Sequence, residues 1–248
     1  MKKTATVKRI LAQLKNDPRT VALILLVPAF LLSLLYFVFM DAPVAPGQRP
    51  VFDRIGPLML AILPLILMSI VTSVVMLRER GSGTLERIFT TPITRLNLLL
   101  SYAAVFGALA VIQSLILSAL LFWAFDVSVV GHWSVLVLLA FLSALIGIAF
   151  GLLASAFARN EFQAVQLMPV FVAPQIFLCG LFVPTENMPK VLDVISAWLP
   201  MTWAVDVALE TLRSPEVSSG SWWRIGALGV AVVVALIAAA ASMPRKTA

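Results

Sequence analysis

Residues 133–158 read WSVLVLLAFLSALIGIAFGLLASAFA, a stretch without a charged side chain. A helix crosses the apolar core of a bilayer, about 30 Å thick, with about 20 residues, so this stretch is long enough to span a membrane. Small side chains recur in it at four-residue spacing, at Ser143, Gly147, Gly151 and Ser155. Such a stripe lies on one helix face and allows another helix to approach closely. We therefore predict a membrane-spanning helix that packs tightly against a neighbour.

Further uncharged stretches of similar length lie on both sides of this one. Together they predict six spans, at about 20–40, 55–77, 99–125, 133–158, 162–185 and 225–243. The composition agrees, because 61% of the 248 residues are apolar and 12% are charged, whereas soluble domains have about 45–50% and about 25%. The stretches do not alternate between apolar and polar residues, as an outer-membrane β-barrel requires. The predicted fold class is an all-α integral membrane protein with six transmembrane helices.

The basic residues are distributed unequally between the two sides of these spans. If both termini lie on one side, that side holds 13 of the 18 Lys and Arg residues. They are Lys2, Lys3, Lys8, Arg9, Lys15, Arg19, Arg78, Arg80, Arg87, Arg95, Arg159, Arg245 and Lys246. The positive-inside rule then predicts a multi-pass protein of the cell membrane with both termini in the cytoplasm. Because the charge follows topology and does not cluster on one soluble face, no nucleic-acid partner is expected.

Residues 1–19 are predicted to form a cytoplasmic N-terminal helix, separate from a transmembrane domain at 20–248. Apolar residues recur in it at helical spacing, at Val7, Ile10, Leu11 and Leu14. The cations Lys8, Arg9 and Lys15 fall largely on the other face. A short basic amphipathic helix lies in the membrane surface, with its cations near anionic lipid headgroups. Asp17-Pro18 is expected to end it. A frayed polar tail is the alternative.

The chain has no recognisable source of energy or catalysis of its own. No Asp, Glu, Lys or Arg lies well inside a predicted span, and no GxxxxGK[ST] phosphate loop is present. One His and one Cys cannot supply an ordinary zinc site or a protease centre. We therefore expect a transport protein that is not an enzyme and binds no cofactor or metal. Any active transport must then draw its energy from another polypeptide.

The predicted fifth span, 162–185, combines prolines with glutamines. Pro169 and Pro174 are expected to bend the helix and to free backbone carbonyl groups. The candidate pathway residues in this span are Gln166, Pro169, Gln175 and Phe177. These glutamines can equally pack against neighbouring helices through interhelical hydrogen bonds, and the sequence leaves both interpretations open.

The connection between the second and third spans has the pattern of a helix that docks a protein partner. Its candidate contact residues are Glu79, Arg80, Gly83, Thr84, Leu85, Glu86, Arg87, Phe89, Thr91 and Pro92. A Gly-Ser-Gly turn precedes a short helix whose apolar face, formed by Leu85, Ile88 and Phe89, is bordered by charges of both signs. Thr94 is expected to cap the following helix. The alternative is an interfacial helix that lies against lipid.

Residues 179–212 are apolar enough for a membrane, but three prolines divide them into pieces too short to span it. These prolines are Pro184, Pro189 and Pro200. We predict an outer hairpin of two short helices that re-enter the outer leaflet. Phe182 belongs to its entry, and Trp203 is expected near the membrane interface.

Four motifs in chain order give the sequence a family resemblance. They are Asn16-Asp17-Pro18-Arg19-Thr20; Glu79-x-x-x-Gly83-Thr84-Leu85-Glu86 leading to Thr91-Pro92-Ile93; Gly180-x-Phe182-x-Pro184 with Asn187-Met188-Pro189; and Leu199-Pro200-Met201-Thr202-Trp203-Ala204-Val205-Asp206. With this order and spacing, the chain resembles the ABC type-2 transporter permeases, a family of drug, polysaccharide and lipo-oligosaccharide exporters. Ser101-Tyr102 departs from the Gly-Lys pair of many relatives, which leaves the contacts at the exit of the loop open.

The resemblance implies partners and roles for these segments. Permeases of this family have six spans, form homodimers or heterodimers, and dock two separate ABC ATPase subunits, which bind ATP and Mg. By resemblance, residues 83–91 correspond to the coupling helix that contacts the ATPase, and the N-terminal helix corresponds to the interfacial helix beside it. Spans one, two and five would line the pathway, and the outer hairpin would close its outer end.

The sequence thus predicts the membrane permease subunit of an ATP-driven ABC exporter. Spans that are apolar and carry no fixed charge favour lipophilic drugs or lipid-like amphiphiles, taken from the cytoplasm or the inner leaflet. One alternative is the export of a polysaccharide or a lipid-linked glycan. An alternative of another class is a non-transporting membrane scaffold or immunity factor, which would need no ATPase encoded beside it.

Overall fold

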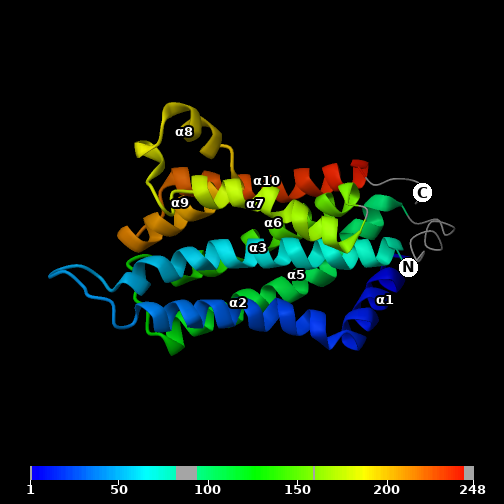
Figure 1. The fold of residues 1–248 in the computed structure, drawn as a ribbon, viewed down its shortest axis with the longest axis horizontal. Coiled ribbons are helices and arrows are strands. Elements are labelled where there is room, and N and C mark those ends of the chain that lie inside the picture. The colour runs from blue at the N-terminus through cyan, green and yellow to red at the C-terminus, as the bar shows by residue number, and fades with distance from the viewer. Residues whose placement is uncertain (1, 82–93, 159, 243–248) are drawn as a thin grey trace.

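The computed structural model describes residues 2–81, 94–158 and 160–242, and no β-strand occurs among them. The chain forms a bundle of long helices (Figure 1). Its elements are α1 (Lys2–Asn16), α2 (Pro18–Phe39), α3 (Val51–Gly81), α5 (Arg95–Ala119), the π-helical η1 (Leu120–Ala124), α6 (Trp133–Phe157), α7 (Glu161–Leu178), the 3₁₀-helical η2 (Thr185–Asn187), α8 (Lys190–Ser196), α9 (Pro200–Arg213) and α10 (Ser219–Ser242).

Five helices of the described residues are long and apolar enough to cross a membrane. They are α2, α3, α5 with η1, α6 and α10, and they coincide with five of the six predicted spans. Helices α8 and α9 meet the same criteria only as a pair, and a bend of 90° separates them. The chain is therefore a multi-pass membrane protein with five or six apolar segments. The prediction of an all-helical membrane fold is confirmed.

The predicted fifth span is shorter than the sequence pattern suggested. Its helix, α7, ends at Leu178 and not at residue 185, and it is not among the five spanning candidates. Cys179 leaves the helical conformation, and Gly180 follows with φ +86°, a left-handed conformation that glycine adopts readily. The predicted end of the fifth span, at residue 185, was wrong because apolar residues continue beyond the turn at Cys179 and Gly180 that ends the helix.

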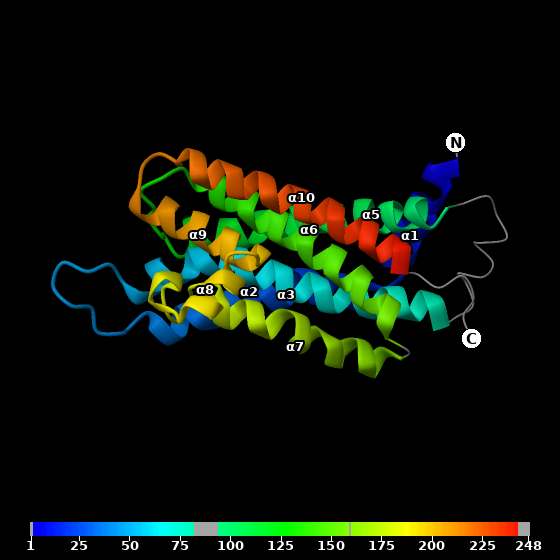
Figure 2. The ribbon, with the colours of Figure 1, turned by 90° about the horizontal axis from the view of Figure 1, so that it is seen from above.

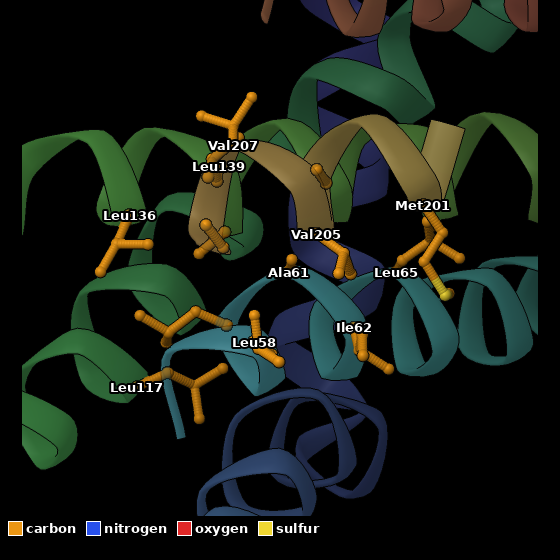
Figure 3. Close-up of a cluster of buried hydrophobic side chains, with 14 of the residues drawn as sticks. Leu58, Ala61, Ile62, Leu65, Leu117, Leu136, Leu139, Met201, Val205 and Val207 are labelled. Atoms are coloured by element: carbon orange, nitrogen blue, oxygen red, sulfur yellow. The ribbon is translucent and has the colours of Figure 1, made fainter. Parts of the chain in front are cut away.

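Helices α3 and α6 form the centre of the bundle and pack along each other. The small-residue stripe of α6 allows this, because a Cβ at Gly147 or Gly151 would overlap the carbonyl oxygens of Leu65 and Ser69 on α3. The predicted close packing is confirmed. Figure 3 shows that α9 completes this core: Met201 and Val205 of α9 lie over the α3 side chains, all buried.

The two ends of the bundle differ in what they contain. We call the end that holds α1, the last turn of α3 and the last turn of α10 the α1 end, and the opposite end, with η2 and the connection between α2 and α3, the far end (Figures 1 and 2). The described chain therefore begins and finishes at the same end. Six spans, as predicted, would likewise return the chain to the side of the membrane on which it began.

Side-chain caps fix the helix starts at the α1 end. Asp17 separates α1 from α2, and its carboxylate accepts hydrogen bonds from the Thr20 hydroxyl at 2.6 Å and the Thr20 N–H at 3.2 Å. These bonds hold the pKa of the Asp17 carboxyl below its ordinary value. Thr94 caps α5 as predicted, and Asn160 caps α7.

Candidate functional site

The last turn of α3 carries three consecutive charged residues, Arg78, Glu79 and Arg80, which we call the α3 triplet. Successive residues of an α-helix point about 100° apart, so three neighbours can reach three different elements. In this structure they contact α7, α1 and α6 respectively. The triplet therefore connects the end of α3 to three other helices, directly before residues 82–93.

Glu79 is the buried member of the triplet. Its side chain is 6% exposed, and its carboxylate accepts hydrogen bonds from the Arg9 guanidinium at 2.6 Å and the Gln13 amide at 3.0 Å. Both donors come from α1. Charge-assisted bonds of this length are among the stronger side-chain interactions, and a buried carboxylate needs them. Glu79 thus joins α1 to α3.

A cavity of about 400 Å³ lies beside this pair, between α1, α3 and α5. Ile10 and Leu14 of α1 and Val75 of α3 form its apolar wall, and Glu79 and the buried Tyr102 of α5 supply polar groups.

Arg78 and Arg80 make the other two connections. Arg78 donates to both carboxylate oxygens of Glu161 at 3.0 and 3.1 Å, which ties α3 to the first turn of α7. Both partners are half exposed, so this pair contributes little stability. Arg80 donates to the main-chain carbonyl of Ser155 in the last turn of α6, where carbonyl groups lack helical donors.

Most of the predicted ATPase-contact residues lie outside the described residues. These are Gly83, Thr84, Leu85, Glu86, Arg87, Phe89, Thr91 and Pro92. The structure does place both ends of this segment, since α3 ends at Gly81 and Thr94 caps the start of α5, both at the α1 end (Figure 1). Glu79 and Arg80, predicted as contact residues, turn towards α1 and α6.

The N-terminal element forms a helix as predicted, and its cations divide into two groups. Lys8 and Lys15 are exposed, whereas Arg9 is engaged by Glu79. Ile10 and Leu14 are buried against the bundle, but Leu11 is half exposed. The position of α1 in the membrane surface stays a prediction.

The pathway candidates on α7 have different environments. Gln166, Pro169 and Phe177 are exposed on this chain, whereas Gln175 is 4% exposed. The Gln175 amide donates to the Phe171 carbonyl at 3.0 Å and accepts from the Met201 N–H at 3.4 Å. Gln175 therefore connects α7 to the start of α9.

The three prolines predicted to divide the outer segment each stand at a helix start. Pro184 precedes η2, Pro189 precedes α8, and Pro200 is the first residue of α9. Phe182 is exposed, and its ring packs on that of Phe177 with centroids 5.6 Å apart. The Trp203 indole donates to the Ala197 carbonyl at 2.7 Å, which supports the turn between α8 and α9.

An open cavity of about 1440 Å³ lies at the far end, between α2, α3, the η2 segment and α9. Its lining includes apolar side chains such as Phe39, Leu58 and Leu181, together with charged residues such as Asp206 and Arg224. Asp206 in its wall pairs with Arg224 at 3.4 Å, which joins α9 to α10. In the described part of the chain, no group of three His, Cys, Asp or Glu residues is placed to hold a metal ion.

Sequence reasoning did not identify Gln13, Arg78, Glu161 or Ser155 as parts of the site. The Arg-Glu-Arg run at the end of a span was the available signal for Arg78. No signal in the sequence pairs Glu79 with α1, because that contact depends on how α1 folds back.

Comparison with known proteins supplies the family. The profile described as "ABC-2 type transporter" matches residues 3–212. The chain is 31% identical over 148 residues to the probable multidrug ABC transporter permease YbhR of Escherichia coli K12, covering 59% of this chain and 38% of that protein. It is 30% identical to the probable multidrug permease YbhS of the same organism, over 55% of this chain and 37% of that protein. It is 27% identical to the linearmycin resistance permease protein LnrN of Bacillus subtilis, over 56% and 36%.

The match thus spans about two fifths of the length of these curated relatives. The family profile, in contrast, covers most of this chain, from within α1 to the end of α9. With its helical membrane fold, the chain belongs to the ABC-2 type transporter family of membrane permeases.

Proposed function

We propose that this chain is the membrane subunit of an ATP-driven exporter. Permeases of this family work with ATPase subunits and form dimers. The partners would be two ABC ATPase subunits, which bind ATP and Mg, a second permease copy or paralogue, and membrane lipids. The α1 end would face the cytoplasm, as the positive-inside rule predicts.

The observation that carries this proposal is the α3 triplet. Residues 82–93 follow it after Gly81 and contain most of the predicted ATPase contact. If a partner displaces this segment, the end of α3 moves, and the contacts of Glu79, Arg80 and Arg78 pass the motion to α1, α6 and α7. A nucleotide shifts such an equilibrium only because the ATPases bind the two permease states with different affinity.

The proposed solutes are lipophilic drugs or lipid-like amphiphiles. The exposed side chains of α2 and α7 are almost all apolar, for example Phe30, Phe37, Val170 and Phe177. Such a surface offers an amphiphile dispersion contacts, and its exposed charges, Arg19 and Glu161, stand in the first turns of the two helices. The names of the multidrug and linearmycin-resistance relatives agree with this class.

The test substitutes two residues of the predicted ATPase contact, Leu85 and Glu86. In the permease expressed with its ATPase, Leu85→Asp with Glu86→Arg should leave the protein in the membrane but separate ATP hydrolysis from solute export. The matched control is Val44→Asp with Glu216→Arg, which makes the same kinds of change at exposed positions of two connections at the far end, outside the outer hairpin. Hydrolysis stimulated by a panel of drugs and lipids is measured together with export. Unchanged coupled export in the first variant would refute the docking assignment.

A further inference from the structure

Pro28 lies inside the apolar helix α2 and removes one of its backbone hydrogen bonds. In a regular helix the N–H of residue 28 would donate to the carbonyl of Ile24, but proline has no N–H. Both residues are buried, and Ile24 is 0% exposed. Inside a membrane no water is available to satisfy such a carbonyl, so another group has to do so.

Gln113 of α5 supplies the missing donor. Its side-chain amide nitrogen donates to the Ile24 carbonyl oxygen at 3.0 Å, and the Gln113 side chain is 0% exposed. The amide oxygen of Gln113 is also buried, and it has no hydrogen-bond partner among the residues that the structure describes. Burying that oxygen costs free energy, which an apolar residue would avoid. The favourable part of this side chain is therefore its bond to α2.

The two halves of α2 on either side of Pro28 have different attachments. Towards the far end, Tyr36 stacks on Phe125 with ring centroids 4.3 Å apart and meets Phe52 edge-on at 5.1 Å. This fixes that half to α3 and to the end of η1. The other half continues through Asp17 into α1, which Arg9 connects to the α3 triplet.

We infer that Gln113 is a positioning residue for α2, and that with Pro28 it forms a hinge between these two halves. The proline removes the bond that would keep the helix stiff, and the Gln113 amide satisfies the freed carbonyl while the two halves keep their separate attachments. The part of this inference that concerns transport rests on the proposed function, in which α1 is one of the helices that receive the motion of α3. The hydrogen-bond part does not.

The test is a double-mutant cycle on the 248-residue chain in nanodiscs, with no ATPase present. Gln113→Met leaves the Ile24 carbonyl without a donor and should lower the melting temperature by about 3–6 °C. Pro28→Ala restores the helical N–H, so in that background Gln113→Met should have little effect. Ser114→Ala is the control, because Ser114 is a buried neighbour on α5 whose hydroxyl has no hydrogen-bond partner in the described part of the chain. It should change the melting temperature equally in both backgrounds.

Hydrogen exchange distinguishes the hinge from a general packing defect. Gln113→Met should raise exchange in α2 peptides that contain residues 20–27 more than in peptides from α6, and Pro28→Ala should reverse the increase. Equal losses of stability in both backgrounds, or an increase spread over the whole bundle, would overturn the inference. A failure of ATP-driven export would count against the proposed function only, since this cycle needs neither nucleotide nor solute.

Discussion

Glu79 stands at the end of the membrane helix α3, and its carboxylate is almost entirely buried. Its two oxygens accept hydrogen bonds from Arg9 and Gln13 of α1. Removing it leaves the Arg9 guanidinium partly buried without its partner. We therefore expect Glu79→Ala to lower the free energy of unfolding by about 1–3 kcal/mol, because the cost of an unpaired buried charge outweighs the lost bond. Thermal unfolding of the purified protein in detergent measures this change.

The control for Glu79→Ala is Glu161→Ala. It removes the other carboxylate bound by the α3 triplet, but the Arg78–Glu161 pair is about half exposed on both sides. A pair in water contributes about 0–1 kcal/mol, so this variant should remain close to wild type. An equal loss in both variants would mean that burial of Glu79 does not determine the strength of its bonds.

The candidate residues show where sequence reasoning stops. Charges beside a glycine turn at the end of a span predicted that Glu79 and Arg80 belong to a functional segment. The pattern did not predict that Glu79 binds Arg9, 70 residues away, because that pairing depends on how α1 folds back at Asp17. The pairing of Gln113 with Ile24 was likewise unpredictable. A proline at position 28 of a helix leaves the carbonyl of residue 24 without its helical donor, but it does not say which side chain will bind that carbonyl.

Among the helices, the contact of α3 with α6 depends on two glycines. Gly151→Ala or Gly147→Ala places a Cβ against backbone atoms of α3, which cannot move aside as a side-chain tip can. We expect each substitution to reduce the free energy of unfolding by about 1–3 kcal/mol, the usual cost of overpacking a core. Denaturant titration in detergent micelles measures the change.

Gly226→Ala and Gly229→Ala on α10 provide the matched comparison. A Cβ at either position meets no atom within 4 Å, so only helix propensity changes, and that change favours alanine. These variants should be neutral or slightly more stable than wild type. If they lose as much stability as the α6 variants, the close approach of α3 is not the cause.

The length of the uncharged stretches predicted most of the long helices, because a bilayer requires long uncharged helices with turns and charges outside them. It did not predict where α7 ends, since Leu181, Phe182 and Val183 are as apolar as the helix before them. What ends the helix there is the turn at Gly180, whose left-handed backbone conformation the apolar pattern does not reveal. Pro184, Pro189 and Pro200 were better guides, because proline fits the start of a helix better than its interior.

The whole molecule gives an orientation that can be tested directly. Trp123, Trp133, Trp222 and Trp223 are exposed at the helix ends that face the far end, which is typical of side chains at a membrane–water interface. Among the described residues, most Lys and Arg lie towards the α1 end, on α1, at the start of α2, at the end of α3 and at the start of α5. We expect the α1 end to be cytoplasmic and η2 to be external.

The measurement uses single cysteines in a Cys179→Ser background, with a membrane-impermeant maleimide on right-side-out vesicles. Cys179 is the chain's sole cysteine and is buried, so its removal leaves one reactive thiol in each variant. Asn187→Cys, exposed in η2, should react in intact vesicles, whereas Lys15→Cys, exposed on α1, should react only after the vesicles are opened. The reverse pattern would invert the topology and place the α3 triplet, with the proposed ATPase contact, on the side of the membrane where ATP is absent.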